Sequence, residues 1–260
     1  MAEDKDYKVA NLVRGLSILE LMVQHPHGLG TSEINRLTDY PKSFVYRATG
    51  ALLQLGYLER DDKSKKFFLS RKLLTMGTTA LHQSCLMEYA LPVMRELREE
   101  TREGVYIAGM DQARGVMLEY LPALHAFRFF VDTGHQFDLH CAAQGKAMLA
   151  ALPEKKLKTV LSGMKLTRHT ERTITSQRAF RAELRRVRAR GYAVDRAEAI
   201  EGIHCIAAVI LNAKSFPVAA LGVTAPLFRM PEADFERIGQ RVKSAARKVS
   251  RKLGYQETSV

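Results

Sequence analysis

Five residues in the second half of the chain have side chains that can attack a substrate, move protons or bind metal ions: His140, Cys141, Asp195, His204 and Cys205. A thiol with an imidazole and a carboxylate can form a nucleophile and its base, and imidazoles and thiols also bind metal ions. Both His–Cys pairs are adjacent in the sequence, however, and neighbours on a strand point to opposite faces of the sheet. The chain has no HExxH or nucleophile-elbow sequence. An enzyme that uses Cys205 with His140 is therefore the less favoured interpretation, and we expect neither a metal nor a cofactor.

The composition is that of a globular protein with an excess of positive charge. The 260 residues are 46% hydrophobic and 26% charged, enough for one large or two modest domains. The longest apolar runs, CIAAVIL and PVAALGV, are far shorter than the roughly 20 residues that span a bilayer, so we expect no membrane partner. Three scattered cysteines without a CxxC pair argue against a disulfide framework or a zinc finger and favour a cytoplasmic protein. The net charge of +12 favours a polyanionic partner.

The first 40 residues predict two short helices. The segment VANLVRGLSILELMVQ has apolar residues at helical spacing, which predicts a helix that buries Leu12, Leu16, Leu19 and Val23. The residues HPHGLG end this helix. TSEINRLT then predicts a second helix, with Thr31 or Ser32 as its N-cap and a carboxylate in its first turn.

A third helix and a hairpin follow. Pro41 suits a first helical turn, and the expected buried face contains Val45, Ala48, Leu52 and Leu55, opposite Ser43, Tyr46, Arg47 and Gly50. YLER and KFFLS flank a turn at 61–65, so the order is a helix-turn-helix followed by a wing. Such a helix offers donors to base edges, and the wing lysines can reach phosphates. We therefore expect double-stranded DNA to contact Lys42, Ser43, Phe44, Tyr46, Arg47, Lys63, Lys65 and Lys66.

These segments resemble the N-terminal module of the IclR-type transcriptional regulators. The resemblance rests on RGLSIL at 14–19, PKSFVYR at 41–47, LLQLGYL at 52–58 and KFFLSRKLLTMG at 66–77. Several positions differ from the family pattern, among them Asp39, Phe44 and the pair Ala48-Thr49, which replaces a Leu pair. Asp39 stands where the family often has a turn glycine, and an Asp tolerates a left-handed backbone less readily than Gly does. Phe44 replaces the usual small hydroxyl residue, so the DNA sequence that is recognised can differ.

The remaining residues alternate strands and helices. A nearly continuous helical pattern from 74 to 104 is interrupted by Pro92, which we interpret as a linker helix followed by the first helix of a second domain. Strands are predicted at 105–110, 115–121, 125–131, 192–198, 204–211 and 217–226, and helices at 141–152, 176–191 and 231–254. This order predicts an α+β sheet domain.

The helix at 176–191 carries a cluster of arginines at positions 178, 181, 185, 186, 188 and 190. The cluster could bind nucleic acid, RNA included. Phe180, Leu184 and Val187 lie at helical spacing on the other side of the same helix, so we interpret the arginines as its solvated face.

The resemblance to IclR-type regulators continues into this region and covers nearly the whole chain. LHCAAQGKAMLAALP at 139–153 and GYAVDRAEAIEGIHCIAAVI at 191–210 are similar to the family's motifs. The resemblance implies a GAF-like effector-binding domain that senses a small organic acid. By position in those motifs, it implies a pocket lined by Phe127, Phe129, Ala143, Gln144, Gly145, Asp195, Ile203, Cys205, Gly222 and Thr224.

The expected organisation has four parts. Residues 1–75 form the winged helix-turn-helix domain, 76–90 the linker helix, 91–255 the GAF-like domain and 256–260 a C-terminal tail. The resemblance implies a homodimer or homotetramer that regulates transcription, as a repressor or an activator, by binding a promoter pseudo-palindrome.

Overall fold

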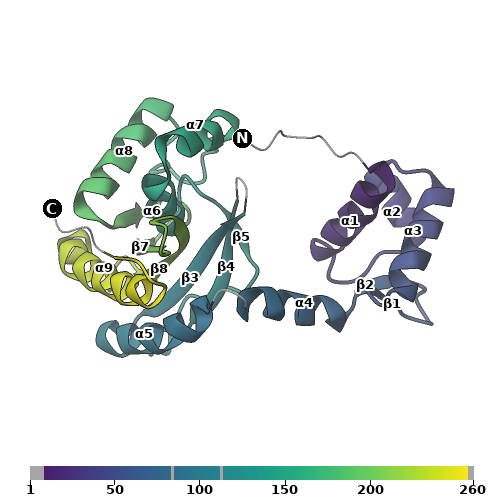
Figure 1. The fold of residues 1–260 in the computed structure, drawn as a ribbon, viewed down its shortest axis with the longest axis horizontal. Helices are drawn as coiled ribbons and strands as arrows, with labels where there is room; N and C mark the ends of the chain where they lie inside the picture. Colours follow the sequence, from purple (N-terminus) through teal and green to yellow (C-terminus); the bar gives the residue numbers. More distant parts are fainter. Residues whose placement is uncertain (1–8, 83–84, 112–113, 257–260) are drawn as a thin grey trace. The chain divides into compact units, whose positions relative to one another are not determined.

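The computed structural model describes residues 9–82, 85–111 and 114–256, and the chain divides into two compact units (Figure 1). The first unit extends to Ser84 and the second begins at Cys85. The predicted tail at 256–260 lies outside the described residues except for its first position. No helix of the described part of the chain is both long enough and apolar enough to cross a membrane.

The N-terminal unit is a winged helix-turn-helix. Its elements are α1 (Ala10–Val23), α2 (Thr31–Thr38), α3 (Lys42–Gln54), β1 (Leu58–Arg60), β2 (Phe67–Leu69) and α4 (Arg71–His82). The core of the unit is formed by buried apolar side chains from the first three helices, both strands and the α1–α2 connection: Ile18, Met22, Leu29, Ile34, Val45, Leu58 and Phe67. The predicted order of helices and hairpin is confirmed.

The predicted buried face of α1 is wrong except for Leu19, which is partly buried and packs against the core. Leu12, Leu16 and Val23 are exposed, whereas Ile18 and Met22 are buried. Both sets have helical spacing, because apolar residues cover more than half the circumference of this helix. Spacing alone therefore could not show which stripe faces the core.

The turn between α2 and α3 depends on Asp39. Its φ of 55° lies in the left-handed region, which is the conformation expected at a position where the family often has a turn glycine. The Asn35 side-chain amide donates a hydrogen bond to the Tyr40 carbonyl oxygen (2.5 Å) and closes the turn. The N-cap of α2 is Gly30 and not Thr31 or Ser32, and its backbone N–H donates to the Glu33 carboxylate (2.7 Å).

The wing is an antiparallel hairpin in which Leu58 pairs with Leu69 and Arg60 with Phe67. Its turn is fixed by Asp61, whose carboxylate accepts hydrogen bonds from the backbone N–H and the hydroxyl of Ser64, both at 2.6 Å. These local hydrogen bonds fix the turn without using a lysine side chain, and Lys63 and Lys65 are exposed.

The helical stretch after the wing breaks earlier than predicted. α4 ends at His82, and α5 (Leu86–Thr101) begins after Cys85, which has a left-handed φ of 50°. Pro92 lies within α5 and does not separate two helices, so the expected interruption there is wrong.

The C-terminal unit is built on one antiparallel sheet with the strand order β5-β4-β3-β8-β7-β6. The strands are β3 (Gly104–Asp111), β4 (Arg114–Leu121), β5 (Gln136–Asp138), β6 (Ala193–Arg196), β7 (Ile203–Leu211) and β8 (Pro217–Pro226). The helices after α5 are α6 (Ala143–Ala151), α7 (Glu154–Gly163), α8 (Gln177–Arg190), the 3-10 turn η1 (Glu232–Asp234) and α9 (Phe235–Lys252).

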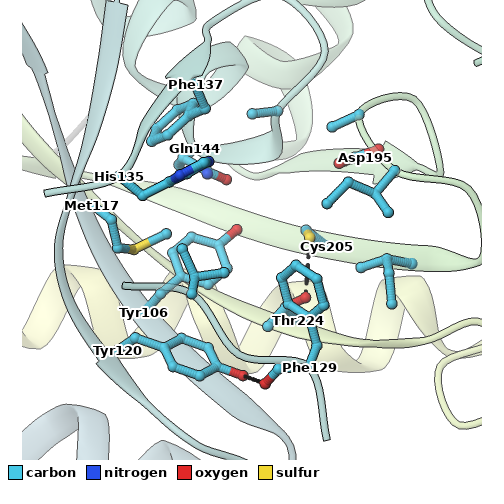
Figure 2. Close-up of a pocket in the computed structure, with 15 residues that line it drawn as sticks. Tyr106, Met117, Tyr120, Phe129, His135, Phe137, Gln144, Asp195, Cys205 and Thr224 are labelled. Carbon is cyan, nitrogen blue, oxygen red and sulfur yellow. Dashed lines mark hydrogen bonds between the residues drawn. The ribbon is translucent and has the colours of Figure 1, made fainter. Parts of the chain in front are cut away.

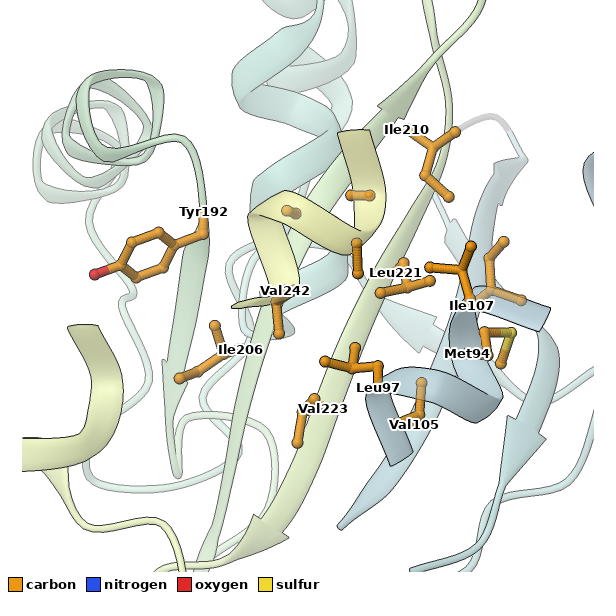
Figure 3. Close-up of a cluster of buried hydrophobic side chains, with 14 of the residues drawn as sticks. Met94, Leu97, Val105, Ile107, Tyr192, Ile206, Ile210, Leu221, Val223 and Val242 are labelled. Carbon is orange, nitrogen blue, oxygen red and sulfur yellow. The ribbon is translucent and has the colours of Figure 1, made fainter. Parts of the chain in front are cut away.

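Helices cover both faces of this sheet (Figure 1). On one face, α5 and α9 pack on the strands through a cluster that includes Met94, Ile206, Leu221 and Val242 (Figure 3). On the other face, α6 and α8 pack on the strands through a second cluster that includes Leu149 and Phe180. The two cores follow from the alternation of side chains along each strand.

The segment 125–131 and α7 differ from the sequence expectations, and the arginine-rich helix agrees with them. The strand predicted at 125–131 is wrong, because this segment is irregular and the edge strand is instead β5, which pairs with β4. The helix α7 was not predicted. The interpretation of the arginine-rich helix is confirmed, since Phe180, Leu184 and Val187 are buried and Arg186 and Arg190 pair with Glu183 of the same helix.

Candidate ligand cavity and nucleic-acid interface

A cavity lies on the α6 face of the sheet, between the strands, the start of α6 and the irregular segment before β5 (Figure 2). It has an empty volume of about 590 Å³, which includes space open to solvent. Its wall is mainly apolar and is formed by Tyr106, Met117, Tyr120, Phe129, Val131, His135, Phe137, Ala142, Gln144, Asp195, Ala199, Ile200, Ile203, Cys205 and Thr224.

The sheet side of the cavity is shaped by an irregularity between β3 and β4. Tyr106 pairs with Tyr120 and Ala108 with Met117, and the register shifts between Ile107 and Ala108. Leu118 is the extra residue, so Met117 and Tyr120, three positions apart, both reach the cavity. On a regular strand, residues three apart point to opposite faces.

Two buried polar atoms at this site have no hydrogen-bond partner. They are the hydroxyl oxygen of Tyr106, which is 2% exposed, and the side-chain oxygen of Gln144, which is 7% exposed. A buried polar group without a partner is costly, and a bound ligand or water removes that cost. Burial also raises the pKa of Tyr106 well above its usual value, so its hydroxyl is a neutral donor.

The acidic end of the cavity contains Asp195, which is buried. Its carboxylate accepts a hydrogen bond from the backbone N–H of Glu198 (2.6 Å). Behind it, the fully buried ammonium group of Lys146 on α6 lies 2.5 Å from the Glu198 carboxylate. Burial, partly offset by Lys146, raises the pKa of Asp195 from 3.8 to about 7.

This pKa shift predicts a pH dependence of stability. Between about pH 4 and pH 7 the folded chain keeps a proton on Asp195 that the unfolded chain has released. The contribution of Asp195 to the free energy of unfolding is therefore present at pH 4 and is lost as the pH rises through 7. Asp195→Asn removes this titration and keeps the oxygen that faces the Glu198 N–H. Urea denaturation at several pH values is expected to show a stability advantage for Asp195→Asn that grows from about pH 4 to about pH 7. A difference that does not change with pH contradicts the shift.

The structure brings six of the ten expected pocket residues to the cavity wall: Phe129, Gln144, Asp195, Ile203, Cys205 and Thr224. The other four lie elsewhere. Phe127 is 69% exposed and packs beside Phe228 (ring centroids 6.5 Å apart). Ala143 and Gly145 are buried in the first turn of α6. Gly222 lies beneath the ring of Tyr106, where an added Cβ would come within 2.5 Å of it.

Several wall residues were not predicted, among them Tyr106, Met117, Tyr120, His135 and Phe137. All but His135 are on β3, β4 or β5. On a regular strand Met117 and Tyr120 would point to opposite faces, and no strand was predicted around Phe137, so the sequence pattern did not mark these residues as one cavity wall.

The alternative catalytic pairing is not formed. The Cys205 thiol donates to the Thr224 hydroxyl (3.3 Å), and burial raises its pKa, which disfavours the nucleophilic thiolate. His204 lies on the opposite side of β7, with its Nδ1 at 2.9 Å from the Met230 carbonyl oxygen. His140 Nε2 bonds to the Thr167 carbonyl oxygen (2.9 Å). The expectation that His204 and Cys205 serve different faces is confirmed.

The second candidate site is the exposed face of α3 with the wing. Lys42, Ser43, Tyr46 and Arg47 are all exposed on this helix, and Tyr46 is 74% exposed. Thr49, whose hydroxyl donates to the Val45 carbonyl oxygen (2.8 Å), is buried on the opposite side. Leu55, expected in the buried face, is exposed. The helix therefore presents hydrogen-bond donors and two cations, Lys42 and Arg47, on its exposed side.

The remaining expected contact residues differ in exposure. Lys63 and Lys65 are exposed in the wing turn. Lys66 is half-buried, with its ammonium group 3.8 Å from the Glu33 carboxylate. Phe44 is half-buried and packs edge-on against Tyr40 (5.7 Å between ring centroids), so its ring belongs to the packing of the turn.

Comparison with known proteins identifies both domains. The sequence profile of the IclR helix-turn-helix domain matches residues 11–62, and that of the bacterial transcriptional regulator IclR C-terminal region matches residues 78–251. The chain is 30% identical over 249 residues to the HTH-type transcriptional regulator KdgR of Escherichia coli strain K12, covering 96% of this chain and 94% of that protein. It is 26% identical to the transcriptional repressor IclR of the same strain, covering 95% of this chain and 91% of that protein.

A solved structure supports the same assignment. The crystal structure of the Thermotoga maritima IclR matches with a TM-score of 0.71 at 30% identity and covers 94% of this chain and 98% of that chain. Both domain profiles and a relative of nearly equal length thus agree with the winged helix-turn-helix and the sheet domain described above. The chain therefore belongs to the IclR family of bacterial transcriptional regulators.

Proposed function

We propose that the chain binds a promoter pseudo-palindrome as a homodimer or homotetramer and that a small organic acid in the C-terminal cavity controls this binding. The observation that carries the proposal is the presence, in one chain, of an exposed basic helix-turn-helix face and of a mainly apolar cavity with buried, unpaired polar atoms. We assign its action to the cytoplasm, where promoter DNA is accessible.

On DNA, α3 would lie in the major groove. Tyr46 and Arg47 would reach base edges from the exposed face of α3, and Ser43 and Lys42 at its start would contact the backbone. Lys63 and Lys65 would contact phosphates beside the groove. Two copies would place their α3 helices about 34–36 Å apart or a multiple of this distance, which requires a two-fold symmetric site.

In the cavity, the wall favours an acid with an apolar or aromatic body. Met117, Phe129, Phe137 and Ile203 provide apolar contacts, and Gln144 lies in the first turn of α6. The N-terminus of a helix presents unpaired backbone N–H groups and a partial positive charge, which suits a carboxylate. The ligand acts only through different affinities for two arrangements of the protein.

The DNA contacts are tested by a double variant, Arg47→Ala with Lys65→Ala. We expect its dissociation constant for the gene's own upstream DNA to rise by about 100-fold, because a base contact of roughly 1–3 kcal/mol and a phosphate contact are both removed. The salt dependence of binding is expected to become less steep, since fewer counterions are released. Fluorescence anisotropy at two salt concentrations measures both effects.

The matched control is Arg178→Ala with Lys155→Ala, two exposed cations of the C-terminal unit. It removes the same charge and is expected to leave DNA affinity unchanged. Equal losses in both double variants would show that affinity follows net charge and not this helix and wing. The same titration with aliphatic and aromatic carboxylic acids tests the second half of the proposal, which fails if none of them changes DNA affinity or the melting temperature.

A further inference from the structure

A second cluster of chemically active side chains lies beside the cavity, at the turn that joins β5 to α6. His140, Cys141 and His169 each offer one ligand atom, and these three atoms lie within 4.8 Å of one another. His140 and Cys141 are buried, and His169 is exposed. We propose that these three residues bind a zinc-type divalent transition-metal ion. The proposal is independent of the DNA-binding and effector-binding functions proposed above.

The conformation of the turn makes the convergence of neighbours possible. Leu139–Ala142 form a turn between the end of β5 and the start of α6, not a strand. The rule that neighbouring side chains point to opposite faces therefore does not apply to His140 and Cys141, although it does apply to His204 and Cys205. The sequence expectation of no metal site used that rule for both pairs.

His140 is 0% exposed, and only one of its two ring nitrogens has a hydrogen-bond partner. Its Nε2 lies 2.9 Å from the Thr167 carbonyl oxygen, which can only accept a hydrogen bond, so Nε2 carries the proton. The lone pair of the imidazole is then on Nδ1, and this buried atom has no hydrogen-bond partner. A metal ion bound at Nδ1 would satisfy it. The backbone oxygen at Nε2 is the kind of outer partner that metal-binding histidines use.

His169 is held by a similar outer partner. Its Nε2 lies 2.8 Å from a carboxylate oxygen of Asp138, and the other oxygen of Asp138 lies 2.6 Å from the Arg114 guanidinium. A carboxylate that accepts a hydrogen bond from an imidazole orients the ring and increases its basicity as a ligand. Asp138 is outside the three-residue group and acts as this positioning partner.

The ligand set identifies the class of ion. Imidazole and thiolate favour zinc and related transition metals over magnesium or calcium, which prefer oxygen ligands. Zinc binds both imidazole nitrogen and thiolate sulfur, and zinc sites with three protein ligands leave a fourth position open for water. Tetrahedral zinc with bonds of about 2.0 Å to nitrogen and 2.3 Å to sulfur needs these ligand atoms about 3.3–3.5 Å apart. His169, the exposed member of the group, would have to move inward by the remaining distance.

The cluster is also connected to the cavity. Phe137 and Ala142, on either side of the β5–α6 turn, line the cavity wall. On the His169 side, the hydroxyl of Thr170 donates to the Ala197 carbonyl oxygen (2.8 Å) and that of Thr173 to the Glu198 carbonyl oxygen (2.7 Å). A bound ion would link the β5–α6 turn to the segment 169–173, which is hydrogen-bonded to residues 197 and 198 beside the cavity.

The test uses the full chain, treated with a chelator and then titrated with Co²⁺, whose visible and thiolate charge-transfer absorption reports its ligands. The background is Cys85→Ser, because Cys85 is an exposed thiol. We expect one Co²⁺ per chain with a thiolate band. Cys141→Ser is expected to abolish the band, and Asp138→Asn to weaken Co²⁺ binding about 10–100-fold. His169→Ala, which changes an exposed residue, is expected to weaken binding at least as much as Asp138→Asn.

The matched control is Cys205→Ser, which changes the other buried thiol near the cavity and is expected to keep the band. Circular dichroism of each variant verifies that it is folded, and Zn²⁺ competition verifies that both ions use one site. A band that persists in Cys141→Ser or disappears in Cys205→Ser overturns the proposal. It is also overturned if His169→Ala leaves the affinity unchanged, or if no Co²⁺ binds to the folded chain.

Discussion

Glu198→Ala is expected to lower the free energy of unfolding of the C-terminal unit by about 3–5 kcal/mol, because it leaves a buried ammonium group without a counter-charge. Lys146 is 0% exposed and Glu198 is 4% exposed, and their charged groups lie 2.5 Å apart. Asp195 is the nearby acid, and its pKa of about 7 leaves it partly protonated at neutral pH. The chain has no tryptophan, so urea denaturation followed by circular dichroism is the suitable measurement.

The control for this experiment removes both charges. Lys146→Met with Glu198→Leu replaces the ion pair by apolar side chains, which is often neutral or stabilising for a buried pair. We expect this double variant to recover most of the stability lost in Glu198→Ala. If the double variant is as unstable as Glu198→Ala, the loss comes from packing around residue 198 and not from an unpaired charge.

Gly145→Ala is expected to destabilise the same unit by about 3 kcal/mol or more, at or above the upper end of the usual overpacking cost. A Cβ at this position would lie 2.2 Å from the carbonyl oxygen of Leu139 and 2.5 Å from its Cα. Both are backbone atoms, so no side-chain rotation relieves the contact, and the start of α6 must move away from the β5–α6 turn. That movement displaces Gln144 at the cavity wall, and thermal shifts produced by ligands are expected to disappear with it.

The comparison is Gly163→Ala at the end of α7, where an added Cβ meets nothing within 4 Å. This substitution restricts the unfolded chain and is expected to be neutral or to stabilise by up to about 1 kcal/mol. Thermal and urea denaturation of the two variants measure the difference. Similar stabilities for both variants would show that α6 tolerates a shift at its first turn.

The sequence predicted the N-terminal unit more completely than the C-terminal one for a physical reason. Turns and a short hairpin depend on neighbours in the chain, and the left-handed Asp39 and the Asp61 turn follow from local chemistry. The face of α1 does not, because Ile18 is buried by residues far along the chain, such as Phe67. Which stripe of an apolar helix faces the core is a tertiary property.

The same distinction explains the cavity. Ile203, Cys205 and Thr224 were assigned to it by the resemblance to the family, and alternation along β7 places Ile203 and Cys205 on the same face. Met117 and Tyr120 could not, because the extra residue Leu118 that brings both to the cavity appears only when β3 and β4 are paired. The run at 125–131 has strand-like composition, but β5 occupies the edge of β4 where such a strand would pair.

The wall of the cavity offers one carboxyl group and, within the described part of the chain, no lysine or arginine side chain. The buried Lys146 ammonium group behind Asp195 is already paired with Glu198, so a carboxylate that entered beside Asp195 would add a negative charge that one proton held between the two acids could neutralise. Binding of the proposed acid near neutral pH would then consume a hydrogen ion, and its apparent affinity would increase as the pH falls.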